Sequence, residues 1–426
     1  MSKACDVLIV GAGIAGLTLA LELHAADISC QVYEAVPALK PLGVGINVLP
    51  HAVCVLDRLG LRERLAAVAV TTKESAYFNR HGQLICREPA GLAAGYAWPQ
   101  FSIHRGDLHE VLLKAVRERL GADCVVTDRR CTGARNVGDH ALAHFVDSMG
   151  TPHDARASVV VACDGIHSAL RKQFYPDEGV PRYAGNNMWR GATKWPSFLS
   201  GATMVRAGWF TVGKMVIYPI RDAVDADGNQ LVNWVAEIAR PQPARRDWNG
   251  RGRVQDILPT FADWRFDWLD VAGLIESTAE VLEYPMVDQD PLPRWTFDRL
   301  TLLGDAAHPM VPRGSNGAGQ SILDASFIAR QFERQGVCPE ALAAYERTRR
   351  QQTSDVVLMN RKAPPDKILQ VVHERTHGKR FERIEDVVGA DELAAIVNQY
   401  KTVAGYALDQ LSGESRSGQN RSGFST

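Results

Sequence analysis

The sequence predicts an α/β fold: a Rossmann-like dinucleotide-binding domain, interleaved with a β-sheet domain and followed by C-terminal helices. Three observations predict it. A glycine-rich turn follows a buried strand near the N-terminus, and two later apolar strands end in Asp-Gly and Gly-Asp. Between those two strands lie segments such as "GWFTVGKMVIYPI" and "LVNWVAEIAR", whose pattern is typical of a sheet with one covered face.

Composition and charge favour a soluble, cytoplasmic protein with neither a nucleic-acid nor a membrane partner. The 426 residues carry a formal net charge of -1, and no long run of Lys and Arg occurs. No apolar segment approaches the roughly 20 residues that a transmembrane helix needs. The eight cysteines include no CxxC pair and no cluster with His at metal spacing, so we expect reduced thiols and no metal site.

The N-terminal stretch "DVLIVGAGIAGLTLAL" carries the first motif. A buried strand at 7–10 runs into Gly11, Gly13 and Gly16, and an apolar helix follows. In such a GxGxxG turn the first glycine permits the tight bend, the second admits a pyrophosphate, and the third lets the helix pack on the strand. The next strand ends in Glu34, which is placed to bind the ribose of an adenosine. The motif predicts NAD or FAD without deciding between them.

Two further strand ends carry the second and third motifs. "ASVVVACDGIHSALRKQF" places Asp164 after a buried strand, with Ser168 and Arg171 following. "TLLGDAAHPMVPRGSNGAGQSILDA" places Asp305 in the same position, before a glycine-rich helix start. Taken alone, each Asp could be a turn or capping residue, and His308 a buried structural histidine.

In this order, GxGxxG…E, DGxxSxxR and GDAAHPxxP…G…G resemble the three fingerprints of the single-component (group A) FAD-dependent aromatic hydroxylases, of the para-hydroxybenzoate and salicylate hydroxylase type. The resemblance spans nearly the whole chain and includes the segments 41–61 and 102–116. Segments 187–208, 232–238 and 310–325 are similar to the phenazine-carboxylate hydroxylase branch, although hydroxylases of other aromatic substrates share these features.

This resemblance implies FAD as cofactor and assigns residues to its parts. Glu34 would hold the adenosine ribose, Arg105 the ribityl-phosphate region, and Asp305 the ribityl or pyrophosphate portion. Asp164 would support both the pyrophosphate and transient nicotinamide binding. Backbone N–H groups at 316–318 would face the pyrimidine edge of the flavin. The full set of expected FAD contacts is Gly11, Gly13, Ala15, Gly16, Glu34, Gly45, Arg105, Asp164, Asp305, Asn316, Gly317 and Ala318.

The implied reaction is hydroxylation of a small aromatic or heteroaromatic substrate, such as a phenazine, with or without loss of a carboxyl group. NADH, or alternatively NADPH, would reduce FAD, and dioxygen would then form a flavin C4a-hydroperoxide that transfers its terminal oxygen. The candidate catalytic residues are Pro309, Tyr218 and His308, with a turn, core packing or structural support as their respective alternatives. The candidate substrate contacts are Arg190, Tyr218, Trp234 and Met310, with Arg313 as an alternative to Arg190.

The predicted domains interleave along the chain. Residues 1–72, 98–180 and 285–364 form the FAD-binding domain, 73–97 and 181–284 the substrate-binding sheet, 365–411 a C-terminal helical segment and 412–426 a disordered tail. We expect a monomer or homodimer.

Three alternative functions remain open on the sequence alone. They are a flavin halogenase, a flavin dehydrogenase, and a non-catalytic binding protein of the GDP-dissociation-inhibitor type. The halogenase pattern WxWxIP is absent, and the intact Gly-Asp motif argues against the binding protein.

Overall fold

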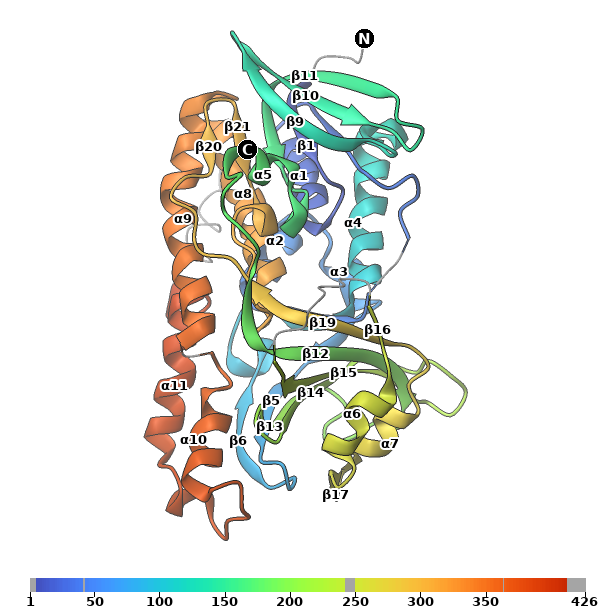
Figure 1. The fold of residues 1–426 in the computed structure, drawn as a ribbon, viewed down its shortest axis with the longest axis vertical. Coiled ribbons are helices and arrows are strands. Elements are labelled where there is room, and N and C mark those ends of the chain that lie inside the picture. Colours follow the sequence, from blue (N-terminus) through green and yellow to red (C-terminus); the bar gives the residue numbers. More distant parts are fainter. Residues whose placement is uncertain (1–4, 41–42, 242–249, 363, 412–426) are drawn as a thin grey trace, which may run out of the picture.

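The computed structural model describes residues 5–40, 43–241, 250–362 and 364–411. A mixed sheet with its helices occupies one end of the molecule and a broad antiparallel sheet the other, and long helices run along one side (Figure 1). The predicted disordered tail, 412–426, lies outside the described residues.

The first sheet has a parallel centre. Five strands run parallel in the order β21-β11-β1-β2-β8, β20 pairs antiparallel at one edge, and the hairpin β9–β10 continues from β11. The strands are β1 (Cys5–Val10), β2 (Cys30–Tyr33), β8 (Val125–Val126), β9 (Arg130–Val137), β10 (His140–Val146), β11 (Pro152–Ala162), β20 (Thr296–Phe297) and β21 (Leu300–Leu302). All three sequence motifs follow the carboxyl ends of adjacent strands, β1, β11 and β21, which is where such sheets bind nucleotides.

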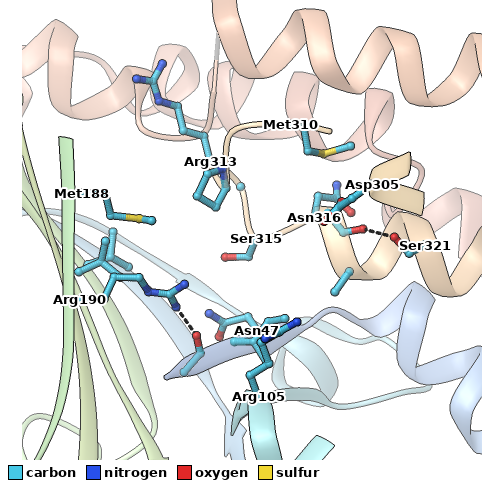
Figure 2. A pocket seen from close by; sticks show the side chains of 18 of the residues that line it. Asn47, Arg105, Met188, Arg190, Asp305, Met310, Arg313, Ser315, Asn316 and Ser321 are labelled. Carbon is cyan, nitrogen blue, oxygen red and sulfur yellow. Dashed lines mark hydrogen bonds between the residues drawn. The ribbon is translucent and has the colours of Figure 1, made fainter. Parts of the chain in front are cut away.

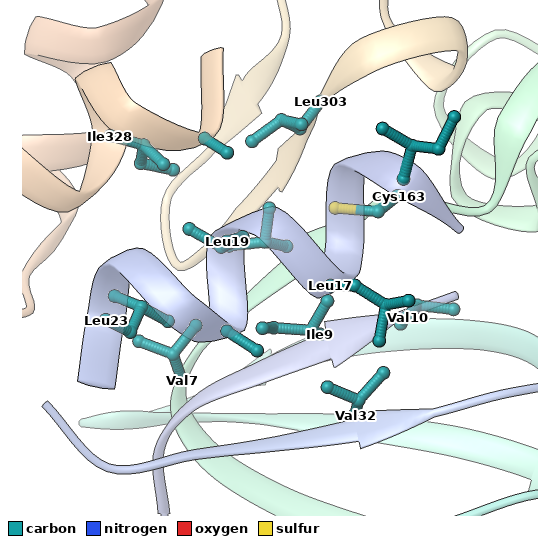
Figure 3. Packing of buried hydrophobic residues seen from close by; sticks show 14 of the residues in the cluster. Val7, Ile9, Val10, Leu17, Leu19, Leu23, Val32, Cys163, Leu303 and Ile328 are labelled. Carbon is teal, nitrogen blue, oxygen red and sulfur yellow. The ribbon is translucent and has the colours of Figure 1, made fainter. Parts of the chain in front are cut away.

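Helices cover this sheet and bury its apolar residues. Helix α1 packs between the sheet and α8, where Leu17 and Leu19 meet Val10 of β1 and Ile328 of α8 in one core (Figure 3). The strands of this centre are apolar on both faces, as expected for a covered parallel sheet. The helices are α1 (Ile14–Ala25), α2 (Pro50–Arg58), α3 (Arg62–Ala66), α4 (Arg105–Leu120), α5 (Ala169–Phe174), α8 (Gly317–Gln335) and α9 (Pro339–Lys362).

The second sheet is mainly antiparallel and has the order β16-β19-β12-β15-β14-β13-β5-β6. Its strands are β5 (Glu74–Phe78), β6 (Leu84–Pro89), β12 (Arg182–Trp195), β13 (Thr203–Trp209), β14 (Gly213–Arg221), β15 (Gln230–Ala239), β16 (Gly250–Gly252) and β19 (Val281–Asp288). The pieces α6 (Val254–Phe261), α7 (Val271–Glu276), β17 (Arg265–Phe266) and β18 (Leu269–Asp270) cover one face. Strand β19 runs past residue 284, so the sheet crosses the boundary that we predict there.

A small sheet and two helices complete the fold. The small sheet consists of β3 (Gly45–Val48), β4 (Val70–Thr72) and β7 (Gln100–His104). Strands β3 and β4 each pair antiparallel with β7. Helices α10 (Lys367–Thr376) and α11 (Ala390–Val403) pack on β5 and β6 through a separate apolar cluster that includes Tyr77 and Ile368. The C-terminal segment is therefore joined to the second sheet.

Close packing explains the glycines of the first turn. Gly11 has a φ of 101°, and a Cβ there would lie 2.6 Å from the carbonyl oxygen of Cys163. A Cβ on Gly16 would lie 2.0 Å from the carbonyl oxygen of Gly11, whereas a Cβ on Gly13 would meet no atom within 4 Å. Two of the glycines thus allow the chain to close on itself, and Gly13 keeps a space open.

This difference predicts that two alanine substitutions lower stability by very different amounts. Gly16→Ala should lower the free energy of unfolding by about 1–3 kcal/mol, because the new methyl group displaces backbone. Gly13→Ala should change it by less than about 0.5 kcal/mol. Urea unfolding of ligand-free protein measures both, and equal losses in the two variants would contradict this account of the turn.

Candidate functional site

The main cavity lies where the two sheets meet. It encloses about 320 Å³ and extends from the first turn of α1 past the start of α4 to the beginning of α8 (Figure 2), and the second sheet forms its floor. Most residues that the sequence predicts for the site come together here. Those lining the cavity are Gly13, Ala15, Gly45, Arg105, Arg190, Tyr218, Asp305, Met310, Asn316, Gly317 and Ala318.

One end of the cavity can receive a pyrophosphate. In the described chain, no side chain caps the N-terminus of α1, so the N–H groups that follow Gly13 face the cavity without a capping partner. Helix N-termini with free N–H groups attract phosphate. Arg105, the first residue of α4, lines the same space and adds a positive charge.

Glu34 and Asp164 flank this end without lining the cavity. The Glu34 carboxylate accepts hydrogen bonds from the N–H groups of Ala12 (2.8 Å) and Val36 (3.0 Å) and so braces the glycine turn. Asp164 Oδ2 accepts from the N–H of Ala169 (2.8 Å), while its Oδ1 is buried without a hydrogen-bond partner among the described residues. Burial raises the pKa of Asp164. Their contacts with FAD stay predictions.

Asp305 and the start of α8 form the opposite wall of the same space. The Asp305 side chain is exposed into the cavity, and desolvation by the surrounding protein raises its pKa against the opposing charges of His308 and Arg105. Asn316 is the N-cap of α8, and its side-chain amide Nδ2 is buried with no partner in the described part of the chain. Unsatisfied buried groups at a cavity wall are what a bound polar ligand would pair with.

His51 of α2 fixes Asn316 from behind. Its Nε2 donates to Asn316 Oδ1 at 3.1 Å, and burial lowers the pKa of His51 to about 4. The neutral ring therefore serves as a hydrogen-bond donor at neutral pH. The motif "GINVLPHAV" gives no sign of this role, because a histidine in an apolar helix has many possible functions.

The structure favours the supporting role that the sequence leaves open for His308 over a catalytic one. Its Nε2 donates to Asp324 Oδ2 at 2.6 Å inside the core, and the ring does not line the cavity. His308 is a positioning residue for the third motif. Pro309 is buried next to it, and a contact of Pro309 with substrate stays a prediction, because its neighbour Met310 is the one that lines the cavity.

The second motif also acts on the third. Arg171 is buried, and its NH1 donates to the carbonyl oxygens of Ala306 (3.0 Å) and Ala307 (2.9 Å). Ser168 caps α5 by accepting from the N–H of Arg171 at 3.1 Å. The spacing of Asp164, Ser168 and Arg171 within DGxxSxxR thus has a structural reason, since one short segment braces two walls of the site.

Arg190 and Tyr218 form one side of the floor. The Arg190 guanidinium donates to the carbonyl oxygen of Gly45, and Arg190 and Asn47 lie near enough to Tyr218 to influence its pKa. Burial raises the pKa of Tyr218, against the opposing charge of Arg190, so its hydroxyl stays protonated at neutral pH. A larger residue than glycine would not fit at position 45, because a Cβ there would lie 2.6 Å from Asn233 and 2.8 Å from Tyr218.

The structure contradicts a substrate contact of Trp234. Its ring lies in the core on the far face of β15, and its Nε1 donates to Thr278 Oγ1 at 2.8 Å. Successive strand residues point to opposite faces, so Asn233 and Val235 face the site and Trp234 cannot.

A buried charged cluster at the floor is absent from our sequence predictions. Lys214 Nζ lies 2.7 Å from Glu237 Oε1 and also pairs with Asp366, while Arg206 Nε lies 3.3 Å from Asp366 Oδ1. All four line the cavity. A charged residue inside a strongly apolar strand, as in "GKMVIYP" and "VAEI", was the available signal. Asp366, which lies just before α10, had no comparable signal.

The described residues hold no group of three or more His, Cys, Asp or Glu side chains arranged for a metal ion. Nor is any helix in the described ranges long and apolar enough to cross a membrane.

Fold and site together define a flavin-dependent oxidoreductase of the hydroxylase architecture: a nucleotide sheet with three motifs at its strand ends, and a second sheet closing the flavin side of the cavity. The residues present fit FAD. Gly13 leaves open space, two helix N-termini face one cavity, and Asp164 and Asn316 keep unsatisfied polar atoms beside it.

The chain belongs to the FAD binding domain family, whose family model matches residues 4–205 and 275–359. Phenazine 1,6-dicarboxylic acid hydroxylase PhzS of Lysobacter antibioticus is 43% identical over 84% of this chain and 89% of its own length. 3-Amino-4-hydroxybenzoate 2-monooxygenase PtnB3 of Streptomyces platensis is 34% identical, covering 80% of this chain and 83% of that protein. Salicylate hydroxylase of Pseudomonas putida is 29% identical, covering 91% and 88%.

Solved structures share the fold. Klebsiella pneumoniae HpxO complexed with FAD and uric acid superposes with a TM-score of 0.73 at 23% identity over 96% of both chains. A salicylate hydroxylase substrate complex gives 0.73 at 23% identity over 96% of this chain and 98% of that one. The predicted fold class, family and FAD cofactor are confirmed: the protein is an FAD-dependent aromatic monooxygenase, of a family that typically uses NAD(P)H.

The buried His51 predicts a specific dependence of stability on pH. Its pKa is about 4 in the folded protein against 6.5 in the unfolded chain, so the unfolded state gains protons that the folded state excludes. This contribution should cost the fold about 3 kcal/mol as pH falls from 6.5 to 4, and it should level off below that. Urea unfolding at several pH values should show a shallower loss for His51→Gln, and parallel curves for the two proteins would contradict the assignment.

Proposed function

We propose that this protein hydroxylates an aromatic carboxylate of the phenazine type, using FAD, NADH and dioxygen. One observation carries the proposal. Arg190 lines the cavity floor next to Tyr218, and among the described residues no carboxylate lies within ion-pair distance of it. A half-buried cation without an acidic partner favours a ligand that brings the anion.

The relatives support this choice of substrate. The most similar of those named above acts on phenazine 1,6-dicarboxylic acid, and others act on 3-amino-4-hydroxybenzoate and, by name, on salicylate, which are aromatic acids. At 43% identity the first of them is also the one whose substrate this chain is most expected to share.

The protein's own contributions are binding, orientation and the exclusion of water. When bound, FAD supplies the acceptor for the hydride of NAD(P)H and the activation of dioxygen. The N–H groups at the start of α1 would hold its pyrophosphate, and Arg105 and Asp305 its sugar-phosphate chain. The start of α8 would place partial positive charge at the edge of the ring, where negative charge develops on reduction.

On the substrate side, Arg190 would fix one carboxylate and thereby the orientation of the ring. The Tyr218 hydroxyl, which stays protonated, can donate to a polar substituent of the substrate. A ring nitrogen, amino or hydroxyl substituent would supply the activation of the ring, since the floor carboxylates among the described residues, Glu237 and Asp366, are held in ion pairs with Lys214. Which carbon reacts, and whether a carboxyl group leaves, would follow from this orientation.

The test is a turnover assay on purified FAD-loaded protein. Phenazine-1-carboxylate, phenazine-1,6-dicarboxylate and salicylate are each supplied with NADH or NADPH in air, and both nucleotide consumption and product mass are measured. We expect a phenazine product that has gained one oxygen or exchanged a carboxyl for a hydroxyl group, and faster consumption with NADH. Consumption that yields hydrogen peroxide and no oxygenated phenazine would overturn the choice of substrate.

Asp305 offers a separate test of the FAD assignment. Asp305→Ala should weaken FAD binding about 10- to 100-fold, the usual loss for a hydrogen bond to a charged group. Titration of apoprotein with FAD, followed by flavin fluorescence, measures the dissociation constant. Asp227→Ala, in an exposed loop outside the cavity, is the matched control. Equal affinities for both variants would remove Asp305 from the site.

A further inference from the structure

The register of four neighbouring strands divides the cavity floor into three regions. Met188 of β12, Val235 of β15, Val216 of β14 and Met204 of β13 form an apolar stripe running diagonally across the sheet. On one side of it lie Arg190, Asn233 and Tyr218; on the other lie Glu237, Lys214 and Arg206. The floor therefore has an apolar centre between two polar regions, which suits a flat ring system that is polar at both ends.

The second polar region is a buried ion cluster extended by a third cation. Asn186 of β12 donates from Nδ2 to Glu237 Oε2 (3.0 Å) and accepts at Oδ1 from Arg313 (3.1 Å). Arg313 also lies over the ring of Phe210 at 4.7 Å, and the Lys214 ammonium lies 5.1 Å from the same ring. Three cations, Arg206, Lys214 and Arg313, thus share this region with only two carboxylates, Glu237 and Asp366.

Arg313 makes no direct ion pair with either carboxylate, although its charge is one of those that lower the pKa of Asp366. Lys214 contacts both carboxylates and Arg206 contacts Asp366, whereas Arg313 has no carboxylate within 4.0 Å in the ranges that the structure describes. Its Nε is buried and has no hydrogen-bond partner there. Keeping the Arg313 guanidinium partly buried beside two other cations costs free energy unless an anion binds to it.

The two unpaired arginines belong to separate parts of the cavity. Arg190 and Asn186, on which Arg313 rests, are four residues apart on β12, or about 13 Å along a strand. Figure 2 shows Arg190 rising from β12 and Arg313 coming from the loop before α8, with their guanidinium groups directed to different places. Met188, between Asn186 and Arg190 on the same face of β12, belongs to the apolar stripe.

We infer that Arg313, seated on Asn186 beside the Lys214–Glu237–Asp366 cluster, binds a second carboxylate of the aromatic substrate and makes this enzyme selective for dicarboxylates. The inference rests on the proposed function, in which Arg190 holds the first carboxylate. The charges of the substrate floor agree with it: Arg190, Arg206, Lys214 and Arg313 against Glu237 and Asp366 leave two positive charges for a dianion, while Arg105 and Asp305 oppose each other at the FAD end of the cavity. The C-terminal segment contributes Asp366 to this region. Asp366 forms ion pairs with Lys214 and Arg206, so Arg313 can pair with the substrate.

The experiment compares phenazine-1,6-dicarboxylate with phenazine-1-carboxylate in FAD-loaded wild type and variants. In Arg313→Gln the ratio of kcat/KM for the dicarboxylate to that for the monocarboxylate should fall at least about tenfold, since one charged hydrogen-bonding group is lost. Most of the change should lie in KM. Arg313→Lys, which keeps the charge but loses the planar fork, should restore part of the ratio. The control is Arg64→Gln: Arg64 of α3 forms an exposed ion pair with Glu118 of α4, and its loss should leave the ratio unchanged.

Two further measurements make the outcomes decisive. Substrate binding, followed by the flavin absorbance change, should show the same loss of preference without turnover, and the KM for NADH should not move. An unchanged ratio in Arg313→Gln would overturn the inference, and so would a rise in the KM for NADH, which would assign Arg313 to the nucleotide. If wild type hydroxylates neither phenazine, the proposed function itself fails, a result visible without any variant of Arg313.

Discussion

The site depends on one buried carboxylate. Asp324 of α8 is fully enclosed and accepts from the N–H of Gly304 (3.2 Å), from His308 Nε2 (2.6 Å) and from Arg349 Nε (2.7 Å). Burial alone would raise its pKa, but His308 and Arg349 hold it below the ordinary value, so it remains charged. Removing one partner from such an arrangement typically costs about 3–5 kcal/mol. Asp324 thus ties α9, α8 and the strand end that carries Asp305 into one rigid wall, on which the orientation of the α8 N-terminus relies.

A second constraint brings the nucleotide-binding part and the substrate floor together. Strand β3 can lie against β14 and β15 only because Gly45 has no side chain, and its N–H donates to Asn233 Oδ1 at 2.7 Å. Arg190 closes the same contact from β12 by binding the carbonyl oxygen of Gly45. A residue predicted as a cofactor contact is therefore also the joint between the two sheets, so the position of the flavin side relative to the substrate floor is set by backbone contact.

Much of the nucleotide-binding half is predictable from sequence, because its motifs are local. A glycine turn and a strand ending in Asp each need only a short stretch of chain, and Gly13, Arg105 and Asp305 accordingly line the cavity. The substrate half is harder, because side chains from four strands, a loop and the C-terminal segment meet there without sequence proximity. The errors have the same origin. The sequence does not show the strand register that directs Trp234 away from the cavity. It also does not show that Asp324, the hydrogen-bond partner of His308, lies next to it in the fold. Asp366 was missed because only the tertiary fold brings it to Lys214.

The buried ion cluster affects both the stability of the fold and the distribution of charge at the cavity floor. Ion pairs taken out of water are seldom a net gain in stability, so the Lys214–Asp366 and Lys214–Glu237 pairs are better explained by positioning than by strength. Arg206 and Lys214 form ion pairs with the floor carboxylates. The excess positive charge of the floor therefore resides on Arg190 and Arg313, one in each polar region. A neutral aromatic ring would leave both of these guanidinium groups partly desolvated and unpaired, whereas a dianion compensates both. Under the proposed function, discrimination against uncharged aromatics would arise from this charge imbalance at the binding step, before any chemistry at the ring.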